Sequence, residues 1–310
     1  MKILITGIQG FVGSNIVDSM RENHTIYGLD IINTTMSGVV HIYSWNNLSL
    51  LPDVDVVIHL AGKAHDLKNK LLSDEYFDIN TGLTQKIYDW FLKSSATKFI
   101  FFSSVKAAAD KVEGKMLTED VDPKPVGPYG ESKRSAEIYI LNQPLDANVK
   151  RAYILRPSMI HGKGNKGNLN LLLSVVKWGF PWPLGAFENK RSFTSIDNLI
   201  FIINNLIEKD VECGIYNIAD DEAISTNELI AVIADGLSKR IRIIKINQAI
   251  LRFFATIGSF FHLPFNLERL KKLTESYIVS NQKIKKALNI EKMPVNTVEG
   301  LSKTIRSFVK

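Results

Sequence analysis

The sequence contains very little cysteine: Cys213 is the single thiol among 310 residues. One thiol can form neither an internal disulfide nor a site with several thiolate ligands, so nothing in the chain requires an oxidising compartment. We therefore expect a cytoplasmic protein. The six histidines also lack a ligand-like spacing with carboxylates, which argues against a catalytic metal site.

Long apolar runs are missing as well. The N-terminal run from Ile3 to Ile5 is too short for the core of a signal peptide. The most apolar segment, residues 248–265, is interrupted by Arg252 and His262 and falls short of the roughly 20 clean apolar residues of a membrane span. We interpret it as an amphipathic helix packed on the body of the protein, with contact to a membrane surface as the alternative.

Charge of one sign does not dominate the chain. Lysine and arginine exceed the acidic residues by only six, which favours a small anionic ligand over nucleic acid as partner. The composition, 45% apolar and 23% charged, is that of a globular protein and excludes a disordered, collagen-like or coiled-coil chain. Because 310 residues approach the limit of one compact unit, we expect two domains or an inserted lobe.

Apolar, β-rich segments alternate with helix-length segments in the first half of the chain. Continuous apolar strands that alternate with helices indicate an α/β fold, with a doubly wound parallel sheet covered on both faces. Residues 214–218 are a further strand that could return to this sheet. The expected strands are 2–6, 25–29, 55–60, 98–102 and 151–155, and the expected helices are 12–23, 78–94 and 130–141.

The amino-acid composition changes after Arg156, where glycine and proline cluster in residues 162–185. We expect a smaller C-terminal α/β lobe that lies over the edge of the sheet, where open α/β sheets bind their ligands. The predicted division places residues 1–158 in the sheet domain, rejoined by about 192–220. Residues 159–191 and 221–310 form the predicted substrate-binding lobe.

A glycine turn joins the first strand to the first helix and contains Gly7, Gly10 and Gly13. Glycines let a backbone turn tightly and approach a pyrophosphate at the N-terminus of a helix. Asp30 follows 20 residues after Gly10, where a carboxylate can accept both ribose hydroxyls of NAD and repel the extra phosphate of NADP. Although Asp30 alone could simply start a turn, the combination predicts a Rossmann-type domain that binds NAD.

Tyr129 and Lys133 lie four residues apart and share one face of an expected helix. An ammonium beside a phenol favours the phenolate, which makes a base that works near neutral pH. A surface tyrosine and a solvated lysine are the alternative. Ser103 and Ser104 follow the strand at 98–102, and a hydroxyl there could bond the same substrate oxygen.

These residues, together with shorter motifs, occur in the order seen in extended short-chain dehydrogenases. The chain resembles a nucleotide-sugar epimerase, dehydratase or reductase of that family over nearly its whole length. The additional motifs are His59-Leu60-Ala61-Gly62, Asn80, Leu155-Arg156-Pro157, His161-Gly162, Arg191-Ser192-Phe193 and Asp197-Asn198.

The resemblance implies three catalytic residues: Tyr129 as the acid/base, Lys133 to lower its pKa and hold the nicotinamide ribose, and Ser104 as the hydroxyl partner. Ser103 is the weaker candidate for that partner. The implied cofactor contacts besides Asp30 are Gly7, Gly10, Phe11, Val12, Gly13, Leu60, Ala61, Gly62, Lys63, Asn80, Ser103, Tyr129, Lys133 and Pro157.

Three of the implied roles have plain alternatives. Asn80 would order the region beneath the catalytic helix, or it is a helix cap or turn residue. Lys63 would lie near cofactor and sugar, or it is a solvated loop lysine. Arg191 would bind the nucleotide diphosphate, or it forms an ion pair with a neighbour such as Glu188. The implied substrate contacts are Lys63, Ser104 and Arg191.

Departures from the family pattern narrow the subtype. Val105-Lys106 stands where sugar 4,6-dehydratases have an Asp-Glu pair, which disfavours dehydration. Ala107-Ala108-Ala109 replaces the usual Val-Tyr-Gly, and Ser-Ser-Val-Lys with a nearby His65 is similar to a branch that includes reductases of 4-keto-6-deoxy-N-acetylhexosamine nucleotides. An acidic residue near Ser44-Trp45-Asn46 is absent, so no adenine contact is assigned there.

We therefore expect an NAD-dependent 4-epimerase of a nucleotide-activated, UDP-linked hexose, because a resident NAD suits an epimerase. One alternative is an NAD(P)H-dependent 4-keto reductase of a UDP-4-keto-6-deoxy-N-acetylhexosamine in surface polysaccharide synthesis. The other is a non-catalytic dinucleotide-binding protein, against which the retained Tyr129 and Lys133 argue. We also expect a homodimer in which segments 78–94 and 130–141 pair across a two-fold axis.

Overall fold

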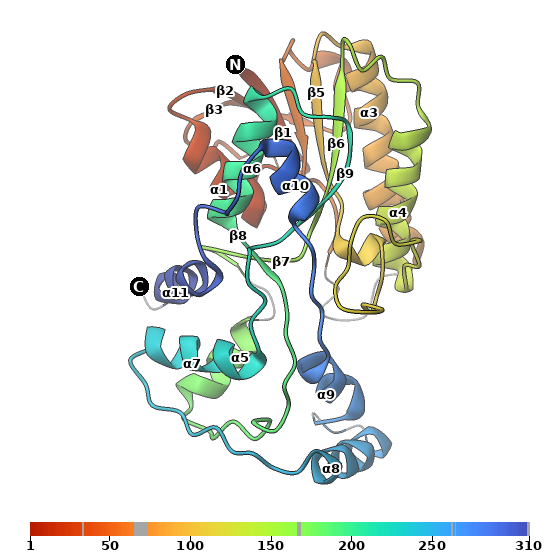
Figure 1. Ribbon diagram of the computed structural model, residues 1–310. Helices are drawn as coiled ribbons and strands as arrows, with labels where there is room; N and C mark the ends of the chain where they lie inside the picture. The colour runs from red at the N-terminus through yellow and green to blue at the C-terminus, as the bar shows by residue number, and fades with distance from the viewer. Residues whose placement is uncertain (33, 65–72, 166–168, 262, 264, 309–310) are drawn as a thin grey trace.

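The computed structural model describes residues 1–32, 34–64, 73–165, 169–261, 263 and 265–308, with the side chains of residues 170 and 171 excepted. A parallel sheet with helices on both faces forms one end of the molecule, and a mainly helical lobe forms the other (Figure 1). Among the described residues, no helix is both long and apolar enough to cross a membrane.

The central sheet has seven strands in the order β3-β2-β1-β4-β5-β6-β9, and every neighbouring pair is parallel. This topology confirms the predicted doubly wound fold, with its reversal of strand order at β1 and β4. The strands are β1 (Lys2–Thr6), β2 (Thr25–Asp30), β3 (Val39–Ser44), β4 (Val56–His59), β5 (Lys98–Phe102), β6 (Arg151–Pro157) and β9 (Gly214–Ile218).

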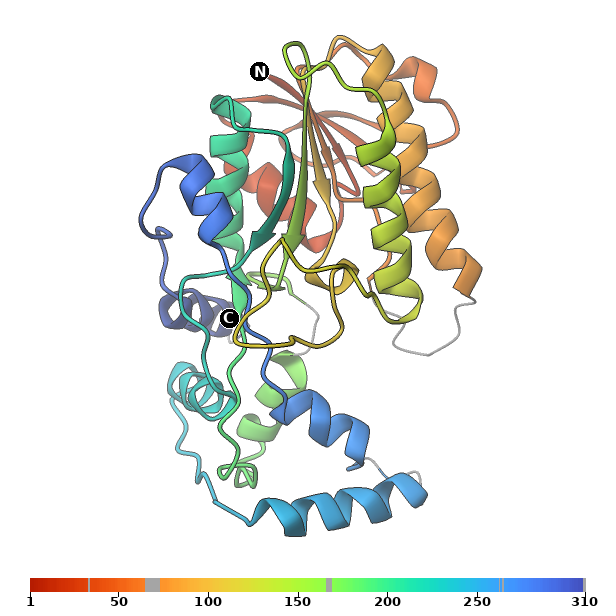
Figure 2. The same cartoon turned by 45° about the vertical axis from the view of Figure 1, so that its right-hand side comes forward.

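Helices cover both faces of the sheet (Figure 2). One core contains buried residues of α1 (Phe11–Met20), α6 (Ile196–Glu208) and α10 (Gln282–Leu288). The core on the other face contains those of α3 (Leu83–Lys93) and α4 (Gly127–Asn142). The carboxyl ends of the strands therefore meet at one edge, between these two helical layers and the lobe.

Two elements differ from the sequence-based expectation in the sheet half. The edge strand β3 was not predicted, because only Ile42 among its six residues is buried and the apolar signal is weak. The helix expected over 78–94 is divided into a π-helix, η2 (Phe77–Gly82), and α3. A π-helical turn inside a helix often marks a functional site.

A separate hydrophobic core holds the lobe together, and it draws on residues from 169 to 305. We expected short strands among its helices, but sheet pairing there is limited to β7 with β8 and to isolated bridges. Contrary to the expected assignment of residues 221–310 to the lobe, α10 packs Ile284 and Leu288 into the core of the sheet. The remaining elements are β7 (Met159–His161), β8 (Phe193–Ser195), α2 (Ser73–Tyr76), α5 (Leu169–Lys177), α7 (Thr226–Gly236), α8 (Gln248–Phe260), α9 (Leu267–Thr274) and α11 (Thr297–Ser307), with 3₁₀ turns η1 (Leu48–Leu50) and η3 (Val105–Ala107).

Candidate active site

The glycine turn is fixed between β1, β4 and α1. Gly7 has a φ of +66°, and a Cβ there would lie 2.9 Å from the backbone of Ala61. A Cβ on Gly13 would lie 2.5 Å from the carbonyl oxygen of Ile8. No side chain caps the N-terminus of α1, and its first turn has no acidic residue. These features fit a pyrophosphate held by the amides of the helix N-terminus.

Asp30 is the last residue of β2, and its carboxylate is held against the glycine turn. Its Oδ2 accepts a hydrogen bond from the backbone N–H of Gln9 at 3.0 Å, and its Oδ1 accepts one from Ile31 at 2.7 Å. A carboxylate fixed at the end of β2, beside the glycine turn, fits the predicted contact with the ribose of NAD.

Replacement of Asp30 by Ala is expected to weaken NAD binding by about 10- to 100-fold, because hydrogen bonds to a charged group contribute about 1.5–3 kcal/mol. The same change should raise the affinity for NADP relative to NAD. Titration calorimetry with both cofactors measures the effect, and Asp18→Ala on the exposed side of α1 is the control. Equal affinity of the unaltered protein for NAD and NADP would contradict this role.

The predicted catalytic residues meet where β5 ends and α4 begins. Ser104 caps the 3₁₀ turn η3, and its Oγ accepts a hydrogen bond from Lys106 N at 3.2 Å. The first turn of α4 is packed on η3 so closely that a Cβ on Gly130 would lie 2.6 Å from the carbonyl oxygen of Lys106. In this arrangement the Ser104 side chain lies near the Tyr129 phenol and acts to lower its pKa.

The electrostatics of this site differ from the expectation that Lys133 lowers the pKa of Tyr129. Burial raises the pKa of the Tyr129 phenol, and the hydrogen bond with Ser104 opposes this shift only in part. The Lys133 ammonium instead donates to the carbonyl oxygen of Phe102 at 2.8 Å and lies 5.1 Å from the ring centre of Phe101. Burial lowers the pKa of Lys133 to about 8.

Lys133→Met is expected to increase stability near neutral pH. The pKa of Lys133 falls from 10.5 to about 8 on folding, so the wild type gains stability as pH rises from about 8 to 10.5 and lacks this gain below pH 8. The methionine variant should therefore be the more stable protein at pH 7, and its advantage should shrink toward pH 10. Thermal melts across this range test the sign, and a constant difference would contradict it.

Asn80 connects the loop after β4 to α4. Its Oδ1 accepts a hydrogen bond from Lys63 N at 2.7 Å, while its Nδ2 donates to Lys63 O at 3.1 Å and Ser132 Oγ at 2.9 Å. These contacts fit the ordering role rather than a helix cap. A Cβ on Gly62 would lie 2.8 Å from Asn80 Oδ1 and 2.9 Å from Lys133 Nζ, so glycine leaves the space that both side chains occupy.

A chain of hydrogen bonds between buried polar side chains holds the backbone of Asn80 in place. Thr84 donates its hydroxyl to the carbonyl oxygen of Asn80 at 2.6 Å, so it accepts from His59 Nε2 at 2.9 Å. His59 Nδ1 then accepts from the Thr6 hydroxyl at 2.6 Å. Burial, followed by the charge of Lys133, lowers the pKa of His59 well below its usual value, in agreement with this neutral tautomer. The sequence alone assigned no role to Thr6 or Thr84, because neither residue belongs to a recognisable motif.

Ser103 points to a different partner from Ser104. Its hydroxyl donates to Glu137 Oε1 at 2.5 Å, and Arg156 binds both oxygens of Glu137 at 2.7 and 2.6 Å. Ser103 therefore contributes to a buried ion-pair cluster, and its hydroxyl is already engaged. Glu137 was missed, although its place four residues after Lys133 on the same helix face could have indicated it.

The remaining predicted contacts of the cofactor lie at the same edge of the sheet. Phe11 and Val12 begin α1, Leu60 and Ala61 directly follow β4, and Pro157 ends β6. These positions extend from the glycine turn along the carboxyl ends of the strands to β6, as a dinucleotide lying across this edge requires.

Lys63 and Arg191 are the predicted substrate contacts that the lobe and its neighbouring loop supply. Lys63 Nζ lies 3.9 Å from Glu75, and both side chains are partly exposed, so this pair is weak. Arg191 Nε donates to the carbonyl oxygen of Glu275 at 3.0 Å. Among the described residues, no salt bridge joins Arg191 to Glu188, and the acidic neighbour whose charge acts on the guanidinium is Glu275. Burial lowers the pKa of Arg191.

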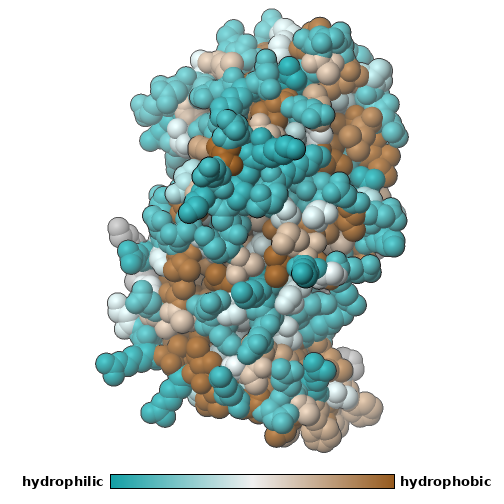
Figure 3. All heavy atoms as spheres, viewed as in Figure 1, coloured by the Kyte–Doolittle hydropathy of each residue, from teal (hydrophilic) through white to brown (hydrophobic). Residues whose placement is uncertain are grey.

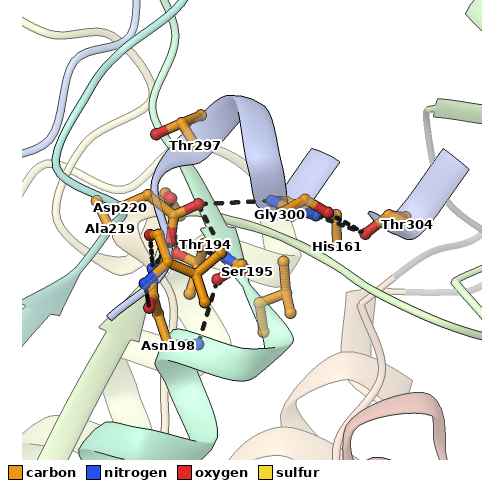
Figure 4. Close-up of polar contacts among 12 residues, drawn as sticks. His161, Thr194, Ser195, Asn198, Ala219, Asp220, Thr297, Gly300 and Thr304 are labelled. Carbon is orange, nitrogen blue, oxygen red and sulfur yellow. Dashed lines mark hydrogen bonds and ion pairs between the residues drawn. The ribbon is translucent and has the colours of Figure 1, made fainter. Parts of the chain in front are cut away.

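The motif residues His161 and Asn198 join the lobe to the sheet. His161 Nδ1 and Thr304 Oγ1 are hydrogen-bonded at 2.9 Å, and His161 Nε2 lies 3.5 Å from Asp220 (Figure 4). Asp220 also accepts from Asn198 Nδ2 at 2.7 Å and from the backbone N–H of Ser195. This buried cluster connects α11, β8 and the end of β9, and its contacts indicate a structural role.

Comparisons with known proteins agree with this architecture. A UDP-glucose 4-epimerase of Vibrio cholerae is 30% identical over 254 residues, which are 76% of each chain. An N-acetyl-alpha-D-glucosaminyl-diphospho-ditrans,octacis-undecaprenol 4-epimerase of Escherichia coli O157:H7 is 26% identical over 302 residues, 92% of this chain and 84% of that one. The solved structure of MoeE5 in complex with UDP-glucuronic acid and NAD has a TM-score of 0.76 at 19% identity and covers 100% of this chain and 99% of its own.

The family model described as "NAD dependent epimerase/dehydratase family" matches residues 3–219. This match, together with the relatives and the solved structures, confirms the predicted family, an enzymatic activity and NAD as the cofactor. The chain belongs to the NAD dependent epimerase/dehydratase family.

Proposed function

We propose that the protein is an NAD-dependent 4-epimerase of a hexose that is linked to UDP through its diphosphate. The observation that carries this proposal is the close packing of the first turn of α4, which bears Tyr129, on the turn capped by Ser104, at the sheet edge that also bears Asp30 and the glycine turn. The likeness to the V. cholerae UDP-glucose 4-epimerase supports the choice of UDP and of C4.

In this proposal, Tyr129 takes the proton from the C4 hydroxyl of the sugar and later returns it to the C4 oxygen. Ser104 hydrogen-bonds the same oxygen and keeps it within reach of the phenol. Bound NAD would supply the reversible hydride transfer at C4 that these side chains lack. Arg191 faces the diphosphate, for which a planar guanidinium fork is suited.

A second candidate substrate is the same kind of diphosphate-linked sugar carried on a polyprenol. The observation that favours it is the extent of the likeness to the E. coli enzyme, which reaches over 302 residues and therefore into the C-terminal lobe. The two candidates share the sugar and its diphosphate, so they share the roles of Tyr129, Ser104 and Arg191.

The proposed epimerase is tested by incubating the purified protein with UDP-glucose and UDP-N-acetylglucosamine and following C4 inversion by proton NMR. Inversion without net consumption of cofactor is expected. Turnover of a 4-keto nucleotide sugar that consumes NAD(P)H would instead establish the reductase. Protein that retains NAD but turns over none of these substrates would support a non-catalytic role.

The proposed homodimer pairs α3 and α4 with their copies across a two-fold axis. These helices lie side by side on the outside of the sheet (Figure 2), and α4 exposes Ile138 and Leu141. Replacement of both by Arg should convert a dimer into a monomer, because like charges would meet across the axis. Light scattering measures the mass, and a wild-type monomer at all concentrations would contradict the dimer.

A further inference from the structure

Helix α8 (Gln248–Phe260) presents a large apolar face to solvent at the far end of the lobe. Figure 3 shows hydrophobic side chains gathered at this lower end of the molecule, among hydrophilic ones. Within α8, the buried side chains are confined to Leu251, Ala255 and Gly258. The sequence-based expectation of a helix packed on the body therefore holds for one narrow stripe only, and most of the apolar surface stays uncovered.

The uncovered residues form one continuous stripe rather than a scatter. Their spacing of three or four residues places them on one side of the helix, well apart from the buried stripe. We call this stripe the docking face, and its members are the exposed Ile250, Phe253, Phe254, Phe260 and Phe261 with the half-buried Ile257 between them. Exposure of the phenylalanines ranges from 56% for Phe254 to 79% for Phe260.

The surroundings of the docking face add further aromatic surface. Trp178 and Phe180 are exposed in the loop after α5, with their ring centres 6.1 Å apart. This loop pairs with the segment that leads into α8, because Trp182 N donates to Arg242 O and Ile244 N donates to Trp182 O, both at 2.8 Å. All six phenylalanine and tryptophan residues that are exposed on the described surface lie in this loop, in α8 or directly after α8.

Positive charge is concentrated in the chain segment that contains α8. Residues 239–272 contain eight lysines and arginines and one acidic residue, Glu268, which gives a surplus of seven. The whole chain has a surplus of six, so the rest of the molecule is close to neutral. The basic residues are Lys239, Arg240, Arg242, Lys245, Arg252, Arg269, Lys271 and Lys272, and all of them are exposed.

The hairpin between α8 and α9 holds the docking face in a fixed orientation. Gly258 passes so close to Phe265 that any Cβ would overlap the carbonyl oxygen of Phe265. Leu263 N donates to Gly258 O at 2.8 Å, and Leu267 N donates to Ser259 Oγ at 3.0 Å. The docking face therefore lies on a helix that is held by close contacts with the segment that leads into α9.

We propose that the docking face binds the surface of an anionic lipid bilayer. Exposed aromatic side chains insert at the boundary between headgroups and acyl chains, while a surrounding basic surplus attracts anionic headgroups. A helix of 13 residues is only about 20 Å long, too short to span a bilayer and suited to lie in its plane. A protein partner or a second copy would not require the basic surplus. We therefore favour the anionic bilayer over these two as the occupant of the docking face.

The test uses the full-length protein and sedimentation with sucrose-loaded vesicles of phosphatidylcholine, with or without phosphatidylglycerol. The wild type should bind the vesicles that contain phosphatidylglycerol, and salt should weaken this binding. Phe253→Ser/Phe254→Ser/Phe260→Ser should reduce the partition coefficient by about tenfold or more. Arg240→Gln/Arg242→Gln/Lys245→Gln should reduce it for anionic vesicles while leaving the thermal midpoint unchanged.

The matched control is Val40→Ser/Leu50→Ser/Val149→Ser, which removes three apolar side chains that are 62–63% exposed in the sheet half. It should bind vesicles as the wild type does. Failure of the wild type to bind anionic vesicles would overturn the proposal, as would undiminished binding by the folded phenylalanine variant. A wild type that binds no vesicles but loses self-association in that variant would assign the face to a second copy instead. None of these outcomes depends on which sugar the enzyme turns over.

Discussion

Tyr129→Phe should lower turnover by roughly 100-fold or more while the protein stays folded, because a lost general acid/base costs about this much. The change removes only a hydroxyl whose partner is Ser104, and the ring can keep its edge contact with Tyr76. The free energy of unfolding should change by only about 1 kcal/mol. Turnover is measured with saturating NAD, and unfolding with denaturant.

Tyr139→Phe is the control for this substitution. Tyr139 also lies on α4, and its hydroxyl donates to Asp89 at 2.5 Å on the side facing α3, away from the predicted site. It should turn over substrate at a rate close to that of the wild type. A normal rate in Tyr129→Phe would remove the catalytic assignment and leave the predicted cofactor site untouched.

Lys133→Met separates two explanations of how the phenol loses its proton. Burial raises the pKa of Tyr129, and the Lys133 ammonium donates to the Phe102 carbonyl. In this structure the ammonium therefore does not lower the pKa of the phenol. If substrate and cofactor bring the two groups together, turnover of the variant should be low at neutral pH and recover partly as pH rises. A flat, low rate would mean that Lys133 acts through the cofactor alone.

The sheet could be predicted from the sequence because its inner strands are mostly buried, largely apolar segments of four to seven residues. The prediction failed at β3, where an edge position exposes Val40 and His41 and the pattern fades. The lobe was less predictable for a related reason. Its strands, β7 and β8, have three residues each, and its other sheet-like pairing consists of isolated bridges that leave no periodic signal.

The predicted site depends on two kinds of information. Gly7, Asp30 and Tyr129 stand at fixed distances from elements that are visible in the sequence, so their meeting at one edge could be expected. The supporting contacts could not, because Thr6, His59 and Thr84 come together only when two strands and a helix pack. Whether Lys133 contacts the phenol of Tyr129 or the carbonyl oxygen of Phe102 likewise depends on how α4 packs against β5.

The buried cluster of Glu137 and Arg156 shows this dependence on packing most clearly. Glu137 is fully buried, and three side chains approach its carboxylate: Ser103, Arg134 and Arg156. Arg156 is buried as well, and its Nη1 has no partner among the described protein atoms. Sequence spacing alone gives no reason to pair residues on α4 and β6 in this way.

Glu137→Ala should therefore destabilise the protein by about 3–5 kcal/mol, because it leaves the Arg156 guanidinium buried without a counter-charge. The double variant Glu137→Leu/Arg156→Met should lose much less, since it removes both charges and keeps apolar volume. Glu268→Ala is the surface control: its partner Lys272 is 72% exposed, and the loss should stay below about 1 kcal/mol. Denaturant unfolding gives all three values.

A double variant as unstable as Glu137→Ala would show that the ion pair itself, rather than the avoidance of an unpaired charge, holds α4 against β6. Because α4 carries Tyr129 and Lys133, loosening this contact should also lower turnover in Glu137→Ala before the fold is lost.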